Sequence, residues 1–117
     1  MKDIKNIKTQ KRTRIRKKIR SKIIGTKNIP RLSVFKSNRH IYAQLIDDET
    51  GKTLCSSSDL SIKNEKKETK AKKVGNLIAN KAKEQKMKEI VFDRSGYKYT
   101  GRIKSLAEAV RKAGLKF

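Results

Sequence analysis

The feature that most constrains this chain is the crowding of positive charge at its beginning. The first 31 residues hold thirteen Lys or Arg side chains and a single acid, Asp3, which is a net +12 out of +22 for all 117 residues. Like charges at this density repel one another, so we expect that the segment does not stay compact alone in water. A polyanion would neutralise it, and nucleic acid is the obvious candidate because phosphate contacts release counterions without any reading of bases.

The only proline, Pro30, marks the predicted boundary between a basic arm, residues 1–29, and a globular domain, residues 30–117. The composition, 34% apolar and 38% charged, leaves room for one modest core. We therefore expect one domain preceded by one appendage.

Part of the arm has the pattern of a helix. Ile15, Ile19 and Ile23 recur every four residues, so a helix over about residues 8–24 would align them in one stripe, with Gly25 ending it. This stripe is thin and contains no aromatic residue, which disfavours a membrane-binding helix. No apolar run in the chain approaches the ~20 residues that span a bilayer.

The globular part opens with three stretches rich in strand-forming residues, 31–37, 40–47 and 52–58. Short turns join them, at residues 38–39 and at residues 48–51, where a glycine can take a positive φ. The third stretch is rich in serine and is predicted to be an edge strand. The three together predict an antiparallel meander.

The periodicity then changes to that of helices. A helix is predicted over residues 65–85 from apolar positions at helical spacing, which are Ala71, Val74, Gly75, Ile78 and Ala82. The apolar run 90–92 predicts a strand buried on both faces, and a second helix is expected over residues 102–113, capped by Gly114. The order β-β-β-α-β-α indicates an α+β domain of two layers with a mixed sheet, because a right-handed crossover makes the fourth strand parallel to the first.

The same element order opens a nuclease fold, but the ligands for two-metal catalysis are missing. The first strand, 31–37, has no acid; the acids at 47–49 belong to a turn, and Asp93 stands alone. His40 has no evident nucleophile to pair with, and the single Cys55 suits a half-buried strand position in a reducing compartment. We expect no enzyme activity, no metal, no cofactor and a cytoplasmic location.

Basic and aromatic residues gather in the loop that follows the fourth strand. They are Arg94, Tyr97, Lys98, Tyr99 and Arg102, set around two glycines. Guanidinium groups bind phosphate and aromatic rings stack on unpaired bases, so this combination suits RNA. The alternative is that the tyrosines cap the core while the cations are merely solvated.

The turn between the first two strands offers short polar groups, Ser37, Asn38, Arg39 and His40, at a hairpin tip. By themselves these residues are a generic turn. The lysines of the helix over 65–85 alternate with glutamates, which is typical of a solvated face. Charge alone leaves a non-specific RNA chaperone or a nucleic-acid-coating protein open as the alternative function.

Three stretches resemble the bacterial large-subunit ribosomal protein eighteen family. They are RLSVFKSNRHIYAQ at 31–44, VFDRSGYKYTGR at 91–102 and LAEAVRKAGL at 106–115. The resemblance implies a structural ribosomal protein that binds 5S ribosomal RNA (rRNA) and helps attach it to the large-subunit rRNA. This attachment would lie in the central protuberance, beside neighbouring ribosomal proteins.

Family members have a basic N-terminal extension that reaches into rRNA, and the resemblance extends this role to the arm. The RNA-binding residues expected from the sequence and the resemblance together are Arg12, Arg14, Arg16, Lys17, Arg20, Lys22, Arg31, Ser37, Asn38, Arg39, His40, Arg94, Tyr97, Lys98, Tyr99 and Arg102.

Overall fold

The computed structural model describes residues 11–15 and 24–117. Its elements are β1 (Arg31–Lys36), β2 (Ile41–Asp47), β3 (Lys52–Ser58), α2 (Lys67–Glu84), β4 (Val91–Asp93) and α3 (Gly101–Lys112). This is the predicted order β-β-β-α-β-α, and every boundary lies within two residues of the expected one.

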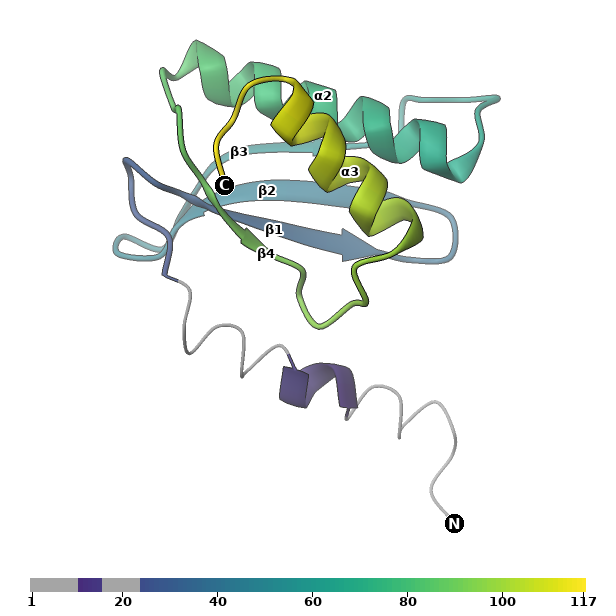
Figure 1. The fold of residues 1–117 in the computed structure, drawn as a ribbon, viewed down its shortest axis with the longest axis horizontal. Helices are drawn as coiled ribbons and strands as arrows, with labels where there is room; N and C mark the ends of the chain where they lie inside the picture. The colour runs from purple at the N-terminus through teal and green to yellow at the C-terminus, as the bar shows by residue number, and fades with distance from the viewer. Residues whose placement is uncertain (1–10, 16–23) are drawn as a thin grey trace.

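The four strands form one sheet in the order β3-β2-β1-β4, and α2 and α3 cover one of its faces (Figure 1). β1 pairs antiparallel with β2, β2 pairs antiparallel with β3, and β4 runs parallel to β1. The predicted α+β class with a mixed sheet is therefore confirmed, and so is the edge position of β3.

The core lies between the sheet and the two helices. Along β2, Ile41, Ala43 and Leu45 are fully buried and alternate with more exposed residues, which is the alternation that a sheet covered on one face requires. Leu32 and Val34 of β1 are buried beside them. These side chains join the apolar faces of the helices in one hydrophobic cluster.

Gly75 lets α2 and α3 approach each other closely. A Cβ atom at this position would lie 2.6 Å from the carbonyl oxygen of Leu106, so any side chain would force the helices apart. Gly75 therefore serves the contact between α2 and α3. Gly114, with a φ of +112°, follows α3 as predicted for a residue just past the helix end.

The prediction that the apolar run 90–92 is a strand buried on both faces is wrong. β4 lies at the edge of the sheet, and its Val91 and Phe92 are only half-buried. Ile90, which is buried, precedes the strand, and Phe92 stacks on Phe117 with 5.7 Å between the ring centroids. The three residues are apolar for different reasons, because Ile90 belongs to the core whereas Phe92 packs against another ring. The pattern of apolar residues in the sequence is the same in both cases.

In the arm, residues 11–15 are helical, within the helix predicted over residues 8–24. Ile24 is outside any helix, and the remainder of that prediction falls outside the described residues. Gly25 is buried, and a Cβ there would lie 2.4 Å from the backbone nitrogen of Arg31, so close packing requires this glycine. The boundary between an arm of residues 1–29 and a domain of residues 30–117 stays a prediction.

Candidate nucleic-acid interface

The structure brings together the two motifs that the sequence presented separately, the hairpin tip (residues 37–40) and the glycine loop (residues 94–102). Arg102, in the first turn of α3, donates from Nη2 to the carbonyl oxygen of Ser37 over 2.8 Å and reaches that of His40 from Nη1 at 3.5 Å. A guanidinium that bonds to two carbonyl oxygens fixes both position and orientation. The tip and the loop therefore form one surface.

Tyr97 makes a second connection between the loop and the end of β1. Its hydroxyl accepts a hydrogen bond from the backbone N–H of Lys36 at 3.3 Å and donates to the Lys36 carbonyl at 3.2 Å. The ring is only 8% exposed and belongs to the core cluster. Base stacking on Tyr97 does not fit this burial, so its role here is to hold the loop in place.

The loop is shaped by consecutive residues in left-handed conformations, Ser95 with a φ of 55° and Gly96 with a φ of 81°. The backbone N–H of Ser95 donates to the carboxylate of Asp93 at 2.8 Å, and Arg94 donates from Nη1 to the Tyr97 carbonyl at 2.9 Å. With its backbone fixed by these bonds, the loop presents Lys98 and Tyr99 to solvent.

The arm packs directly on this loop. The guanidinium carbon of Arg12 lies 5.1 Å from the centroid of the Tyr97 ring, a cation–π contact. A Cβ at Gly96 would lie 2.4 Å from the Arg12 carbonyl oxygen, so only glycine permits this approach. In Figure 1 the helical residues 11–15 lie next to the loop that follows β4, beyond the β4 edge of the sheet and away from α2.

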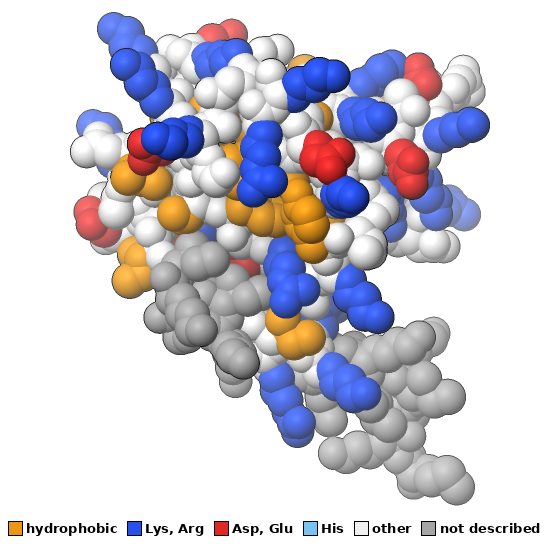
Figure 2. Space-filling model, viewed as in Figure 1, with side chains coloured by type: hydrophobic (Ala, Val, Ile, Leu, Met, Phe, Trp, Pro, Cys, Tyr) orange, Lys and Arg blue, Asp and Glu red, His pale blue; other side chains and the backbone are white. Residues whose placement is uncertain are grey.

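The exposed groups of the hairpin tip and the loop are suited to RNA. Ser37, Asn38 and Arg39 are exposed, and Tyr99, 37% exposed, packs edge-on against Phe92. Figure 2 shows Lys and Arg mixed with Asp and Glu over the helices, whereas around residues 11–15 the charged side chains in view are Lys and Arg. A cationic surface with one open aromatic ring can bind phosphates and stack an unpaired base.

Within the tip, His40 is tied to the body of the domain. Its Nδ1 lies 3.1 Å from the carboxylate of Asp59, which is buried. The backbone N–H of His40 donates to the Ser37 hydroxyl at 3.2 Å, and the Ser37 N–H donates to the His40 carbonyl at 2.8 Å. These bonds hold the turn and leave Asn38 and Arg39 at its outer end.

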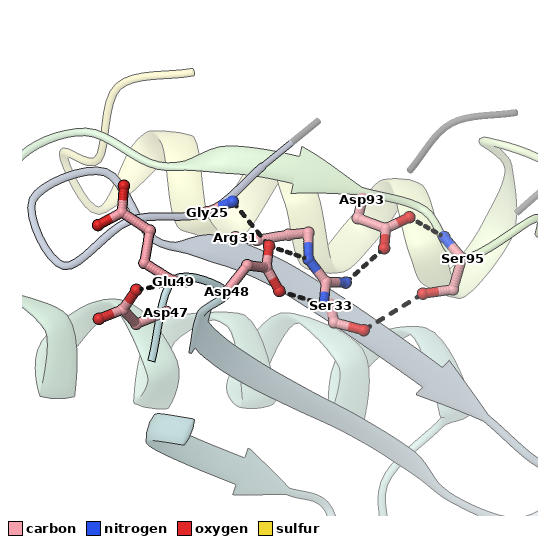
Figure 3. Close-up of polar contacts among 8 residues, drawn as sticks. All are labelled: Gly25, Arg31, Ser33, Asp47, Asp48, Glu49, Asp93 and Ser95. Atoms are coloured by element: carbon pink, nitrogen blue, oxygen red, sulfur yellow. Dashed lines mark hydrogen bonds and ion pairs between the residues drawn. The ribbon is translucent and has the colours of Figure 1, made fainter. Parts of the chain in front are cut away.

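Arg31 is, like Tyr97, a predicted RNA-binding residue that the structure places inside the protein. It is 6% exposed and forms ion pairs with Asp48 at 2.9 Å and with Asp93 at 2.7 Å (Figure 3). Hydrogen bonding to Asp48 raises the pKa of Arg31 above its ordinary value, against the opposing effect of burial. A guanidinium held by two carboxylates has little capacity for RNA, so this geometry favours a structural role.

Asp48 also accepts a hydrogen bond from the backbone N–H of Gly25 at 2.7 Å (Figure 3). The Asp48 N–H donates in turn to the Gly25 carbonyl at 2.9 Å. The charged network around Arg31 thus fixes the point where the arm joins the sheet.

Comparison with known proteins identifies the family of this chain. The family described as "Ribosomal L18 of archaea, bacteria, mitoch. and chloroplast" matches residues 6–117. The chain belongs to the ribosomal L18 family. It is 54% identical to the large ribosomal subunit protein uL18 of Petrotoga mobilis, over 98% of this chain and 96% of that protein. It is 54% identical to the protein of that name from Porphyromonas gingivalis, over 94% and 97% of the two chains.

Membership of the L18 family makes this chain a structural, non-enzymatic protein of the large ribosomal subunit. Its location is the ribosome, which is cytoplasmic in bacteria. No helix in the described part of the chain is long and apolar enough to cross a membrane.

The predicted arm residues of this L18 family member lie partly inside and partly outside the described residues. Arg14 is exposed in the helical residues 11–15. The others, Arg16, Lys17, Arg20 and Lys22, lie outside the described residues. RNA binding by all of these side chains stays a prediction.

Lys36 and the open face of the sheet are not among the features predicted from the sequence. Lys36 lies between the tip and the loop, with Nζ 5.3 Å from the Tyr97 ring centroid. On the face away from the helices, Phe35 is 55% exposed and its ring lies 5.9 Å from that of Tyr42. Alternation in β1 could have revealed Phe35, because Leu32 and Val34 already occupied the buried face.

Proposed function

We propose that this protein binds 5S rRNA and helps attach it to the large-subunit rRNA in the central protuberance, beside neighbouring ribosomal proteins. The observation that carries the proposal is the single surface built from the hairpin tip and the glycine loop, joined by Arg102. Fixed donors on a rigid surface suit an RNA that already has a defined shape. The arm adds binding that depends on charge and reaches into a crevice of the rRNA.

Binding through a fixed surface and binding through diffuse charge differ in how the preference among RNAs responds to salt. Binding by charge alone weakens with salt equally for every RNA, whereas a shaped surface keeps a preference for its own partner. With several phosphate contacts, affinity should fall by orders of magnitude between about 50 and 200 mM salt. The preference for 5S rRNA should survive that fall. A non-specific RNA chaperone has no such preference.

The test is a filter-binding comparison of 5S rRNA with transfer RNA at moderate salt. A triple variant of the interface, Arg39→Gln, Lys98→Gln and Arg102→Gln, should lose most of the preference. A control with the same change in charge at the C-terminal end of α2, Lys83→Gln, Lys86→Gln and Lys88→Gln, should keep it, because these exposed lysines lie at or just after the end of the helix opposite the hairpin tip (Figure 1). Equal affinity of the unmodified protein for the two RNAs would overturn the proposal.

A further inference from the structure

We propose that Arg12, Lys36 and Arg102 together form a binding site for one phosphate group of the RNA backbone, with the Tyr97 ring at its base. The inference rests on the proposed RNA-binding function and adds to it a defined contact at a defined place. This phosphate site lies where the arm, the end of β1 and the start of α3 meet. Lys36, which completes it, stood outside the motifs that the sequence presented.

Two of the three cations, Arg12 and Lys36, lie against the Tyr97 ring. The Arg12 guanidinium carbon lies 5.1 Å and the Lys36 Nζ 5.3 Å from the centroid of the same Tyr97 ring. The ring cannot move freely, because its hydroxyl is bonded to the backbone N–H and carbonyl of Lys36. A fixed ring that attracts cations positions both before any ligand arrives.

Arg102 supplies the third cation. It uses one N–H of Nη2 on the Ser37 carbonyl and directs Nη1 at that of His40. A guanidinium has five N–H donors, so others remain for an anion. The side chain is anchored by backbone groups, which leaves its positive charge without a carboxylate in any ion pair of the described residues.

The electrostatics around Lys36 favour an anion among the three cations. Burial lowers the pKa of Lys36, and the nearby charges of Arg102 and Arg12 lower it further. Across the described residues, no ion pair joins Arg12 or Lys36 to a carboxylate either. Like charges held together in this way repel one another, and an anion placed among them turns that repulsion into attraction.

The donors select phosphate as the anion. Guanidinium groups match the paired oxygens of a phosphate, and an ammonium group adds a compact point charge. A tetrahedral group can receive donors that arrive from different sides, here from the arm, from β1 and from α3. Inorganic phosphate has the same chemistry, so the experiment must separate it from the RNA backbone.

The experiment measures how the affinity for 5S rRNA depends on salt, using the full-length protein. Lys36→Gln and Arg12→Gln should each reduce the slope of log K against log salt, and the double variant should reduce it by about 1 and not by about 2, because both residues serve the same phosphate contact. Lys72→Gln, which removes an exposed charge from α2, should leave the slope unchanged. An unchanged slope for Lys36→Gln, or an equal change for Lys72→Gln, would overturn the inference.

A nuclear magnetic resonance titration of the Lys36 side chain gives a second readout. Addition of 5S rRNA should raise the pKa of Lys36, because the phosphate favours its charged form. A rise with inorganic phosphate alone, with no effect of Lys36→Gln on the RNA slope, would assign the site to free phosphate and overturn the RNA source. The effect of Lys36→Gln on the salt slope can also be measured with transfer RNA. The phosphate site can therefore be tested even if the protein shows no preference for 5S rRNA.

Discussion

Arg102 donates a 2.8 Å hydrogen bond to the carbonyl oxygen of Ser37, although 65 residues separate the two in the chain. The bond connects the first turn of α3 to the tip of the β1–β2 hairpin. Two separate connections thereby become one surface. Its rigidity is what distinguishes shape recognition from attraction by charge alone.

Arg102→Ala should weaken both stability and RNA binding. Loss of the hydrogen bonds to Ser37 and His40 should lower the free energy of unfolding by about 1 kcal/mol. The affinity for 5S rRNA should fall by at least about tenfold, or ~1.4 kcal/mol. Urea unfolding and filter binding measure the two effects. Lys104→Ala, an exposed change two residues along α3 whose contact with Glu108 is long at 3.9 Å, should alter both far less.

Asp93→Ala should be among the most damaging substitutions. Asp93 is fully buried, pairs with the buried Arg31 and accepts a bond from the Ser95 N–H. Removing Asp93 should cost about 2 kcal/mol or more, because Arg31 keeps only Asp48 as a partner in a poorly solvated place and the Ser95 N–H loses its acceptor. Urea unfolding should show this loss. A change below about 1 kcal/mol, similar to that of the exposed Glu49→Ala, would contradict the importance of the network.

Gly96→Ala and Gly101→Ala form a matched pair of substitutions. Both glycines have positive φ, 81° and 55°, so both changes strain the backbone by about 1 kcal/mol. A Cβ at Gly96 also meets the Arg12 backbone at 2.4 Å, whereas nothing lies within 4 Å of one at Gly101. Only Gly96→Ala should therefore displace the arm, which a fluorescent label beside Arg12 can report. Equal responses from the two variants would show that the arm does not dock on the loop.

Lys36→Gln should change the pH dependence of stability. The pKa of Lys36 is below its ordinary value of 10.5 in the folded protein, chiefly because of burial. Between the two values the unfolded chain holds more protons, so stability rises as the pH rises through this window. Below the window the charged group destabilises the fold. Lys36→Gln should be at least as stable at pH 7, and should lack this rise in urea unfolding; a loss of stability at pH 7 would contradict it.

The fold was largely predictable because its signals are local. Strand alternation around Ile41 and helical spacing around Val74 each depend on a few neighbouring residues. The edge position of β4 was not predictable from its short apolar run. Such a run has the same sequence pattern whether a strand lies on each side of it or, as for Phe92, a contact with another ring such as Phe117 covers it.

The site was predictable in its residue types and not in its connections. Basic and aromatic residues marked the tip and the loop, but no local pattern shows that Arg102 bonds to Ser37. Nor does any reveal that Tyr97 faces the core. Arg31 shows the same limit, since a basic residue beside a basic arm turned out to be paired with Asp93, 62 residues away. Long-range contacts decide which cations remain available for RNA.

The most direct test of the account is cleavage of 5S rRNA by iron tethered to the protein. Iron chelates would be attached to Asn38→Cys or Lys98→Cys, each in a Cys55→Ser background, with Asn76→Cys on α2 as the control. If the tip and the loop form one interface, the first two should cut overlapping stretches of 5S rRNA and the control should cut little. Cuts in separate regions from Asn38→Cys and Lys98→Cys, or equal cutting from Asn76→Cys, would contradict the account.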